Sequence, residues 1–232
     1  MIEHPPFLSK FKHKCTVIPY GIQIEKFRLT ERVKAKSEAI RKKFKNPIIL
    51  FVGRLVDYKG IDYLIRAMKK IDATLLIVGK GPEEEKLKNL VNQIGIEKDR
   101  IFFIGSVSDE DLPAYYYASR LLVLPSVSNN EAFGITQLEA HACSRPVVST
   151  GLPTGVPFAN LDGVTGIIVP PRSSDELAKA INRLLKDDRF RQQLGERARE
   201  RVESQFTSKI MAQKILNVYK KVISEDTPTY RG

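Results

Sequence analysis

Short runs of apolar and β-branched residues recur along the chain, and they constrain its fold more than any other feature. Each run has five or six residues and is continuous, which is too short and too uniformly apolar for an amphipathic helix. Strands that are buried on both faces of a parallel sheet have this composition. The sequence therefore predicts parallel strands at residues 48–53, 74–79, 100–105, 120–125, 146–150 and 165–170.

Segments with helical spacing of their apolar residues separate these runs. They lie at 60–71, 82–95, 109–120 and 134–144, and the second begins at Pro82, which suits a first helical position, and closes at Gly95. Strict alternation of strand and helix indicates right-handed β–α–β units in an open, doubly wound sheet. We therefore expect a single α/β domain with a Rossmann-like parallel sheet.

The alternation stops after residue 172. Three helical stretches follow at 173–188, 188–206 and 207–223. Ser173 or Ser174, ahead of two acidic residues, provides a good N-terminal cap for the first of them. The tail at 225–232, EDTPTYRG, is expected to fray.

The composition is that of an ordinary soluble globular protein. With 232 residues and 42% hydrophobic content, the chain can bury a full core. Its longest apolar runs are far shorter than the roughly 18 residues of a membrane-spanning helix, and its N-terminus lacks the apolar core of a signal peptide. Cys15 and Cys143 lie far apart and form no ligand cluster, which argues against a disulfide framework or a zinc site. A cytoplasmic protein with reduced, structural cysteines is expected.

The net charge of +11 would attract nucleic acid, anionic lipid headgroups or a phosphorylated small molecule. However, the 38 lysines and arginines are dispersed among 27 acidic residues, so most of them are interpreted as solvated helix surface. The densest basic stretch, residues 32–45, is at best a candidate patch. No recognised nucleic-acid-binding module accompanies it, and a nucleic-acid partner is not favoured.

The candidate binding and catalytic residues lie at the ends of the predicted strands. Ligands of such sheets bind at the carboxyl ends of the strands. Arg54 and Lys59 follow the first strand, and two cations there suit a diphosphate. Gly79 and Gly81, after the second strand, and Gly105, at the end of the third, would let a ligand approach the backbone closely. Neither GxGxxG nor a P-loop lysine is present, so classical dinucleotide and P-loop chemistry are not supported.

The segment SNNEAFGITQLEAHACSRPVVST, residues 128–150, places one acid before a predicted helix and a second within it. The helix begins at Gly134, and its free amide groups with the helix dipole form an anion site for a phosphate. Glu131 would have to reach past that phosphate, to a sugar whose anomeric carbon develops positive charge. Glu139 lies five residues after Gly134, about 7.5 Å along the axis, where it could accept hydrogen bonds from a ribose diol. Together these groups describe a nucleotide-sugar site.

Each of these features also has an ordinary structural interpretation. Two acids at this spacing could be a dipole partner and an exposed helix residue, the two cations could be solvated, and the glycines of VGKGP could serve a tight turn. His141 is interpreted as a packed or half-exposed helix residue, because no second histidine or acid is spaced for metal binding. His4 and His13 offer no further site, and part of the run Tyr115–Tyr117 is expected in the core.

The ordered set of motifs resembles the C-terminal, donor-binding half of the retaining glycosyltransferases of GT-B family 4. The motifs are VIPYGI at 17–22, FVGRL with its following KG, VGKGP, FIG, EAFGITQLE and AHACSRPVVST, and the resemblance extends from Val17 to about Ile223. Departures are Ala132 and His141, where Gly and Met are common in the family. Family members also carry an N-terminal Rossmann domain with the acceptor site, and this chain begins where that domain should be ending.

The resemblance implies roles for individual residues. Glu131 would contact the donor sugar near the reacting carbon, Glu139 would hold the ribose, and Arg54 and Lys59 would stabilise the diphosphate leaving group. The backbone of Phe133, Gly134 and Ile135 would touch sugar or phosphate. It also implies that 1–20 are the remnant of an interdomain linker, that 21–206 form the nucleotide-sugar-binding domain, and that 207–224 form a helix that crosses back to the first domain.

The function implied is that of a hexosyltransferase (EC 2.4 type) acting in polysaccharide or glycolipid biosynthesis. Its donor would be a UDP-, GDP- or ADP-sugar, with no cofactor and no metal, since no DxD-type motif stands at a strand end. The alternative is a stand-alone nucleotide-sugar-binding module without activity, because the acceptor half of the cleft is missing. Binding of a nucleoside diphosphate would distinguish the transferase and the inactive binding module from a nucleic-acid-binding protein. Turnover with a complementary N-terminal domain would then distinguish the transferase from the inactive module.

Because the acceptor half of the cleft is missing, partners other than the nucleotide sugar are also expected. An acceptor domain could be supplied in trans, and the basic surface is compatible with peripheral membrane contact. The C-terminal helix has an apolar stripe formed by Met211, Ile215, Val218, Tyr219 and Val222, which would lack its cover here. We therefore expect an exposed apolar patch and a tendency to self-associate through this helix.

Overall fold

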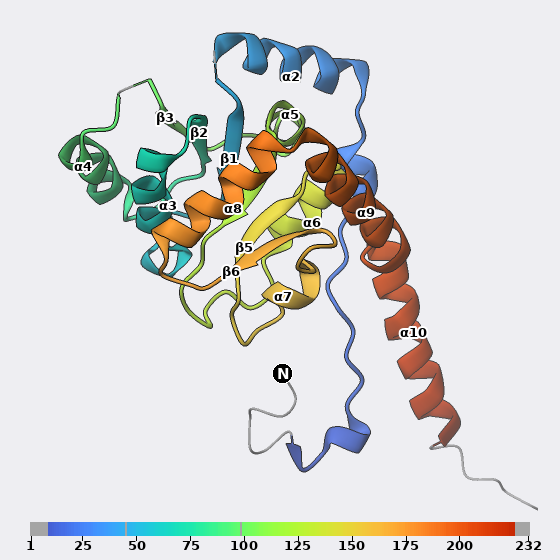
Figure 1. The fold of residues 1–232 in the computed structure, drawn as a ribbon. Coiled ribbons are helices and arrows are strands. Elements are labelled where there is room, and N and C mark those ends of the chain that lie inside the picture. Colours follow the sequence, from blue (N-terminus) through green and yellow to red (C-terminus); the bar gives the residue numbers. More distant parts are fainter. Residues whose placement is uncertain (1–8, 45, 98, 226–232) are drawn as a thin grey trace, which may run out of the picture.

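The six predicted strands all form and lie in one parallel sheet (Figure 1). The structure is a computed structural model that describes residues 9–44, 46–97 and 99–225, so residues 1–8 of the expected linker, with His4, and 226–232 of the expected tail lie outside the described residues. Every strand end falls within one residue of its predicted position. The strands are β1 (Ile48–Val52), β2 (Thr74–Val78), β3 (Ile101–Gly105), β4 (Leu121–Leu124), β5 (Val147–Thr150) and β6 (Gly166–Val169).

The strand order is β3-β2-β1-β4-β5-β6. The chain therefore winds outwards from β1 to β3, crosses the sheet, and winds outwards again from β4 to β6. This is the doubly wound, Rossmann-like arrangement that the alternation of strands and helices predicts. The fold class is confirmed.

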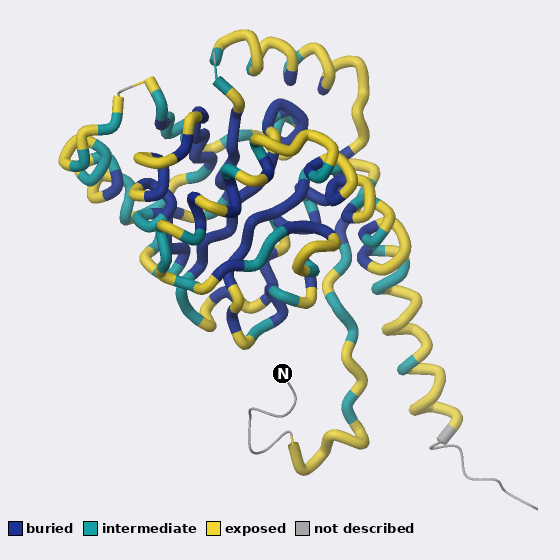
Figure 2. Tube along the Cα trace, viewed as in Figure 1, coloured by how far each residue is buried: buried dark blue, intermediate teal, exposed yellow. Residues whose placement is uncertain are grey.

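The strands are continuous apolar runs because both faces of the sheet are covered. Along β1, Ile48, Leu50 and Val52 point into one core, whereas Ile49 and Phe51 point into the other, as the two-residue period of a strand requires. Figure 2 shows the inner strands as buried, whereas the edge strands β3 and β6 are partly half-buried. A half-exposed sheet would have shown alternating polar residues instead.

Helices cover the two faces as separate groups. On one face α3 packs against α4 and α8, and on the other α5 packs against α2 and α6, while α9 contacts both α6 and α8. Ser173 caps α8 by accepting a hydrogen bond from the amide of Glu176.

The predicted start of a helix at Pro82 is wrong, since α4 begins two residues later, after a turn. The helices are α2 (Glu31–Lys43), α3 (Ile61–Ala67), α4 (Glu84–Ile94), α5 (Leu112–Ala118), α6 (Ile135–Ala142), α7 (Val156–Ala159), α8 (Ser174–Lys186), α9 (Asp188–Gln205) and α10 (Ser208–Glu225), with short 3-10 helices η1 (Lys12–Lys14), η2 (Ile24–Phe27), η3 (Asp57–Lys59) and η4 (Met68–Lys70).

The basic stretch at 32–45 is largely helix α2, which the sequence analysis did not predict. Thr30 caps it by accepting a hydrogen bond from the amide of Val33. The buried face of α2 includes Val33 and Ser37, and the hydroxyl of Ser37 donates to the carbonyl of Lys34. A serine at a buried position interrupts the apolar stripe, which is why the helical period was not recognised.

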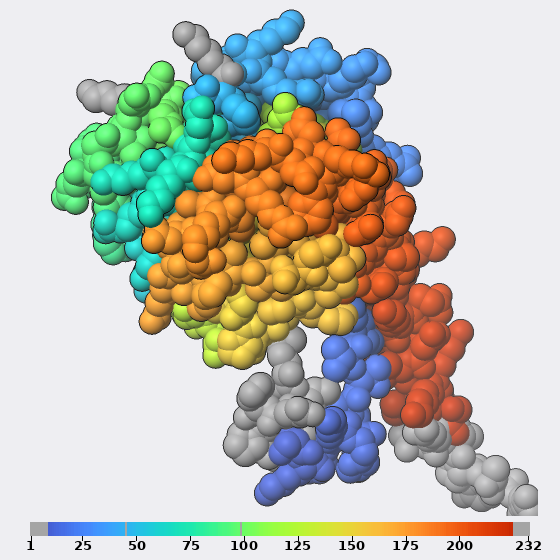
Figure 3. Space-filling view, viewed as in Figure 1, coloured from blue at the N-terminus to red at the C-terminus, as the bar shows by residue number. Residues whose placement is uncertain are grey.

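The C-terminal helix α10 projects from the body of the domain (Figures 1 and 3). At its base, the amide of Ile22 donates to the carbonyl of Phe206, and the amide of Ser208 donates to the carbonyl of Ile22. Ile215, Tyr219 and Val222 are exposed.

Met211 and Val218, expected in the same exposed stripe, are half-buried. The sulfur of Met211 accepts a hydrogen bond from the amide of Gly21. The exposed part of the stripe is therefore shorter than predicted, and self-association through it stays a prediction. No helix in the described part of the chain is long and apolar enough to cross a membrane.

His141 is packed in the core, not half-exposed. It is 1% exposed, and its ring nitrogens have no hydrogen-bond partner of good geometry among the described residues. Burial, with repulsion from Arg201, lowers the pKa of His141 from 6.5 to about 3, and Asn160 opposes the shift only in part. Cys143 is also buried and Cys15 is half-buried, and both are free thiols.

The buried neutral imidazole makes a pH dependence of stability testable. Above pH 6.5 the folded and unfolded chains both hold a neutral His141; below it only the unfolded chain takes up the proton, until about pH 3. The free energy of unfolding should therefore fall by about 2 kcal/mol between pH 7.5 and pH 5 because of this residue alone. Urea unfolding of wild type and His141→Met at both pH values measures the difference. Equal pH slopes in the two proteins would contradict the prediction.

Candidate active site

The sheet reverses its winding direction between β1 and β4, which are neighbours. In open parallel sheets the loops after these two strands diverge and leave a crevice in which ligands bind. Here the loops are residues 53–60, after β1, and 125–134, after β4. The first carries Arg54 and Lys59, and the second carries Glu131.

Lys59 and Glu131 form a buried ion pair between these loops. The Nζ of Lys59 lies 2.5 Å from Oε2 of Glu131, and only 11% and 8% of the two side chains are exposed. The hydroxyl of Ser126 donates to the same carboxylate oxygen at 2.9 Å. Ser126 is held in turn, because the hydroxyl of Thr150, at the end of β5, donates to its carbonyl at 2.5 Å. Three strand ends therefore fix one carboxylate.

This pairing changes the electrostatics that the sequence suggested. A bare Glu131 would repel a phosphate at the start of α6 and would have to reach past it, as the sequence suggests. With its charge compensated by Lys59, the carboxylate can stay beside an anion. The contact of these two residues depends on β1 and β4 being adjacent, so the sequence alone indicates two separate roles for them.

Arg54 is the more accessible of the two expected cations. It is exposed at the end of β1 and makes no ion pair with any residue that the structure describes. An unpaired guanidinium at the mouth of the crevice remains available to an anionic ligand. The two cations thus have different environments, one buried and paired, the other free.

The start of α6 presents unused amides. Gln137 is the first residue whose amide bonds within the helix, to the carbonyl of Gly134 at 2.9 Å, which leaves the amides of Gly134, Ile135 and Thr136 without a backbone acceptor among the described residues. The hydroxyl oxygen of Thr136 is also buried without a partner there. Gly134 has a φ of 72°, and a Cβ at this position would lie 2.5 Å from Leu124.

The residue before this helix start, Phe133, is buried. Its ring packs edge-on against the rings of Tyr20 and Phe206. Ile135, just inside the helix, is 43% exposed. The expected contact of the backbone at 133–135 with sugar or phosphate stays a prediction, and the buried ring of Phe133 anchors that backbone.

Glu139 lines a small cavity next to this helix. The cavity, of about 310 Å³, is also bounded by Gln23, Lys26 and Asp109. The hydroxyl of Tyr116 donates to Oε2 of Glu139 at 2.6 Å. Burial raises the pKa of Glu139, and the Tyr116 hydrogen bond opposes that shift. Within the residues that the structure describes, the carboxylate of Glu139 is thus held in place through Oε2 alone among its two oxygens, by the hydroxyl of Tyr116.

Two of the expected ligand-binding glycines have a structural reason of their own. A Cβ on Gly79 would lie 2.0 Å from the carbonyl oxygen of Gly53, and one on Gly81 would lie 2.2 Å from that of Leu55. The loops after β1 and β2 can pack together only because both residues lack side chains. Gly105 is different, since its φ of 76° is positive but a Cβ there would meet only Lys80, at 3.5 Å.

Three side chains of the site were not recognised from the sequence. Ser126 and Thr136 carry hydroxyls that any loop or helix could expose, and Tyr116 belongs to a tyrosine run of which only part was expected in the core. Tyr116 and Tyr117 are buried. The spacing of 23 residues between Tyr116 and Glu139 gives no signal without the helix packing.

Neither of the two described histidines, His13 and His141, forms a hydrogen bond or ion pair with these groups. His141 is in the core, and His13 is exposed in η1. No group of three or more histidines, cysteines, aspartates or glutamates that could hold a metal ion occurs within the described ranges.

Comparison with known proteins identifies the family. The family model described as glycosyl transferases group 1 matches residues 33–201, which contain β1 to β6 and both loops that border the crevice. The chain belongs to the group 1 glycosyltransferases. Its residues outside that match are the N-terminal segment and the C-terminal helix α10 with the end of α9.

Curated relatives of this glycosyltransferase chain are longer than it is. O-antigen chain mannosyltransferase C of Escherichia coli is 34% identical over 213 residues, which cover 91% of this chain and 56% of the relative. D-rhamnosyltransferase WbpZ of Pseudomonas aeruginosa is 31% identical, over 87% of this chain and 52% of the relative. The chain thus spans about half the length of the relatives it matches.

Solved structures agree with the fold. Sucrose-phosphate synthase of Thermosynechococcus elongatus superposes with a TM-score of 0.82 at 31% identity, covering 95% of this chain and 56% of that one. The C-terminal domain of the group 1 glycosyltransferase LpcC of Francisella tularensis has a TM-score of 0.69 at 26% identity, and all of it is covered by 81% of this chain. The domain therefore has a counterpart that was crystallised on its own.

Proposed function

We propose that this chain is the donor-binding half of a retaining glycosyltransferase of GT-B family 4. It would bind a nucleotide-diphosphate sugar and, with an acceptor domain, transfer the hexose with retention of configuration. The observation that carries the proposal is the Lys59–Glu131 pair in the crevice, followed directly by the free amides at the start of α6, the helix that also holds Glu139 at a cavity of its own.

The diphosphate is assigned to the start of α6. Free amides and the positive end of a helix dipole favour an anion there, and Arg54 has no competing ion-pair partner in the described part of the chain. When the bond between the anomeric carbon and the bridging oxygen breaks, the negative charge moves to that oxygen. Fixed cations and amides stabilise the developing charge without having to reorganise. Arg54 and Lys59 are the residues assigned to this task.

Glu131 and Glu139 are assigned to the two sugars. Glu131 is held beside the crevice by Lys59 and Ser126, where a carboxylate favours positive charge on the anomeric carbon. Glu139 uses one oxygen for Tyr116, and its second oxygen can accept a hydrogen bond from a ribose hydroxyl. The same acids at these positions would bind a nucleotide sugar in an inactive binding module, so binding alone does not establish transfer.

The base of the nucleotide is a matter for experiment. HepE of Anabaena, which shares the fold with a TM-score of 0.81 at 24% identity, was crystallised in complex with UDP. That likeness supports the fold. The affinities of the chain for UDP, GDP and ADP should therefore all be measured. Transfer is tested by turnover of the matching nucleotide sugar with a complementary N-terminal acceptor domain added in trans. Binding without turnover under these conditions favours the inactive binding module.

Glu139→Gln tests the ribose contact. The substitution keeps the size of the side chain and an acceptor for Tyr116 but removes the charge, and we expect nucleoside diphosphate affinity to fall by about tenfold to a hundredfold, because hydrogen bonds to charged groups contribute about 1.5–3 kcal/mol. Calorimetric titration with UDP, GDP and ADP measures the loss, which should affect every ribonucleotide alike. Glu200→Gln, on the exposed surface of α9, is the matched control. Unchanged affinity in Glu139→Gln would remove the assigned role.

A further inference from the structure

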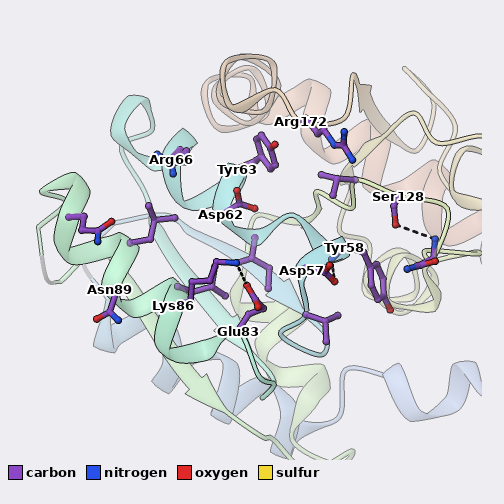
Figure 4. Close-up of a pocket in the computed structure, with 17 residues that line it drawn as sticks. Asp57, Tyr58, Asp62, Tyr63, Arg66, Glu83, Lys86, Asn89, Ser128 and Arg172 are labelled. Atoms are coloured by element: carbon purple, nitrogen blue, oxygen red, sulfur yellow. Dashed lines mark hydrogen bonds and ion pairs between the residues drawn. The ribbon is translucent and has the colours of Figure 1, made fainter.

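A second cavity lies outside the crevice, between α3 and α4 (Figure 4). It has a volume of about 800 Å³, and none of Lys59, Glu131 and Glu139 lines it. Its walls include η3 and the segment 127–130, which are the segments that lead to Lys59 and Glu131. We refer to this cavity as the α3–α4 groove. It adjoins the candidate active site but is separate from it.

The α3–α4 groove combines aromatic rings with hydrogen-bonding groups. The rings of Tyr58 and Tyr63 are half-buried at its wall, and the amide of Asn89 is exposed on α4 (Figure 4). Asp62 and Arg66, one helical turn apart on α3, make no ion pair with any other described residue. The groove therefore holds charged groups that have no ion-pair partner within the described ranges, next to two aromatic rings.

Arg172 is held at the rim of the α3–α4 groove by an unusual backbone conformation. Its φ is 60°, in the left-handed region, where a residue with a side chain is disfavoured by about 1–2 kcal/mol. Like Arg66, it has no ion-pair partner among the described residues, and Figure 4 shows its side chain near Tyr63. Such strain at the rim of a cavity is a reason to look for a function.

The charges of the groove are balanced, which restricts what it can bind. Three acids and three cations line it, and one of each is already joined in the pair of Glu83 with Lys86. A polyanion or a phosphorylated ligand would gain little from such a surface. A chain of sugars fits better, because each hydroxyl both donates and accepts, which uses carboxylate, guanidinium and amide alike. The apolar faces of pyranose rings can pack against tyrosine rings.

We propose that the α3–α4 groove binds a neutral oligosaccharide chain. Its volume lies within the range of about 300–1,000 Å³ of typical ligand sites. Its end at the segment 127–130 would bring a bound chain close to the loop that carries Glu131. The proposal does not depend on the nucleotide-sugar assignment, because none of the residues assigned to the nucleotide sugar lines the groove.

The test uses the whole chain and two neutral probes, a linear mannopentaose and maltopentaose. Titration followed by amide chemical shifts should perturb the residues around Tyr63, Arg66 and Asn89 with at least one probe. The double variant Arg66→Ala/Asn89→Ala should weaken that binding at least about tenfold, since two hydrogen bonds are lost. Arg189→Ala/Asn217→Ala, exposed residues of the same types outside the groove, should bind as wild type does.

A nucleoside diphosphate added in excess distinguishes the two sites. We expect the oligosaccharide to stay bound, whereas a probe that occupied the crevice would be displaced. The proposal is overturned if neither probe binds at millimolar concentration, if the shifts map to the cavity of Glu139, or if the groove variant binds as tightly as wild type. Tighter binding of a sulfated oligosaccharide than of the neutral probes would overturn the stated ligand class.

Discussion

Lys59→Met is expected to lower the free energy of unfolding by about 3–5 kcal/mol, because it leaves the buried carboxylate of Glu131 without its counter-charge. The side chains are similar in length, so the loss would come from the charge and not from a cavity. Ser126 alone cannot compensate, since a hydroxyl contributes one hydrogen bond and no charge. Urea unfolding at pH 7.5 measures the effect.

The double variant Lys59→Met/Glu131→Gln separates folding from function. Glutamine still accepts the hydrogen bond from Ser126, and with neither charge present most of the stability should return, to within about 1–2 kcal/mol of wild type. Nucleoside diphosphate affinity should remain at least about tenfold below wild type, since the cation assigned to the diphosphate is absent. If the double variant were as unstable as Lys59→Met, an unpaired charge would not be the cause.

A second ion pair of the same kind provides the control. The Nζ of Lys70 lies 2.8 Å from Asp175, but 63% and 66% of these side chains are exposed. Exposed pairs contribute about 0–1 kcal/mol, so Lys70→Met should change stability by no more than that. The contrast between the two lysines depends on burial, because the interatomic distances are similar.

Local sequence patterns were sufficient to predict the strands but not their order. A strand buried on both faces is apolar at every position, as β1 and β2 are, and this pattern needs no knowledge of the neighbours. The adjacency of β1 and β4 depends on how the crossover packs, which no run of residues specifies. Helix α2 was missed for the opposite reason, because the buried Ser37 is polar.

The same distinction applies to the site. Lys59, Glu131 and Glu139 could be placed at strand ends or on a helix from the motifs alone. Their partners could not, because Ser126 and Tyr116 reach them through burial and packing. In particular, the charge repulsion that a bare Glu131 would cause disappears once Lys59 is paired with it. The sequence thus predicted the location of these side chains in the fold better than their electrostatic environment.

The glycine at 79 shows how the protein scaffold and the site depend on each other. Gly79→Ala should lower the free energy of unfolding by at least about 3 kcal/mol, because φ is 131° and the new Cβ would lie 2.0 Å from the carbonyl oxygen of Gly53. Backbone atoms cannot rotate away as a side chain can. The loops after β1 and β2 would have to separate, and Arg54 would move with the first of them.

Gly95→Ala is the matched control for this substitution. Gly95 also has a positive φ, of 68°, but nothing lies within 4 Å of an added Cβ. Its cost should be that of the left-handed conformation alone, about 1–2 kcal/mol. The difference between the two variants in urea unfolding therefore isolates the close approach of the loops. Equal losses would mean that the loops can separate freely, and Gly79 would then be available for the ligand contact that the sequence suggested.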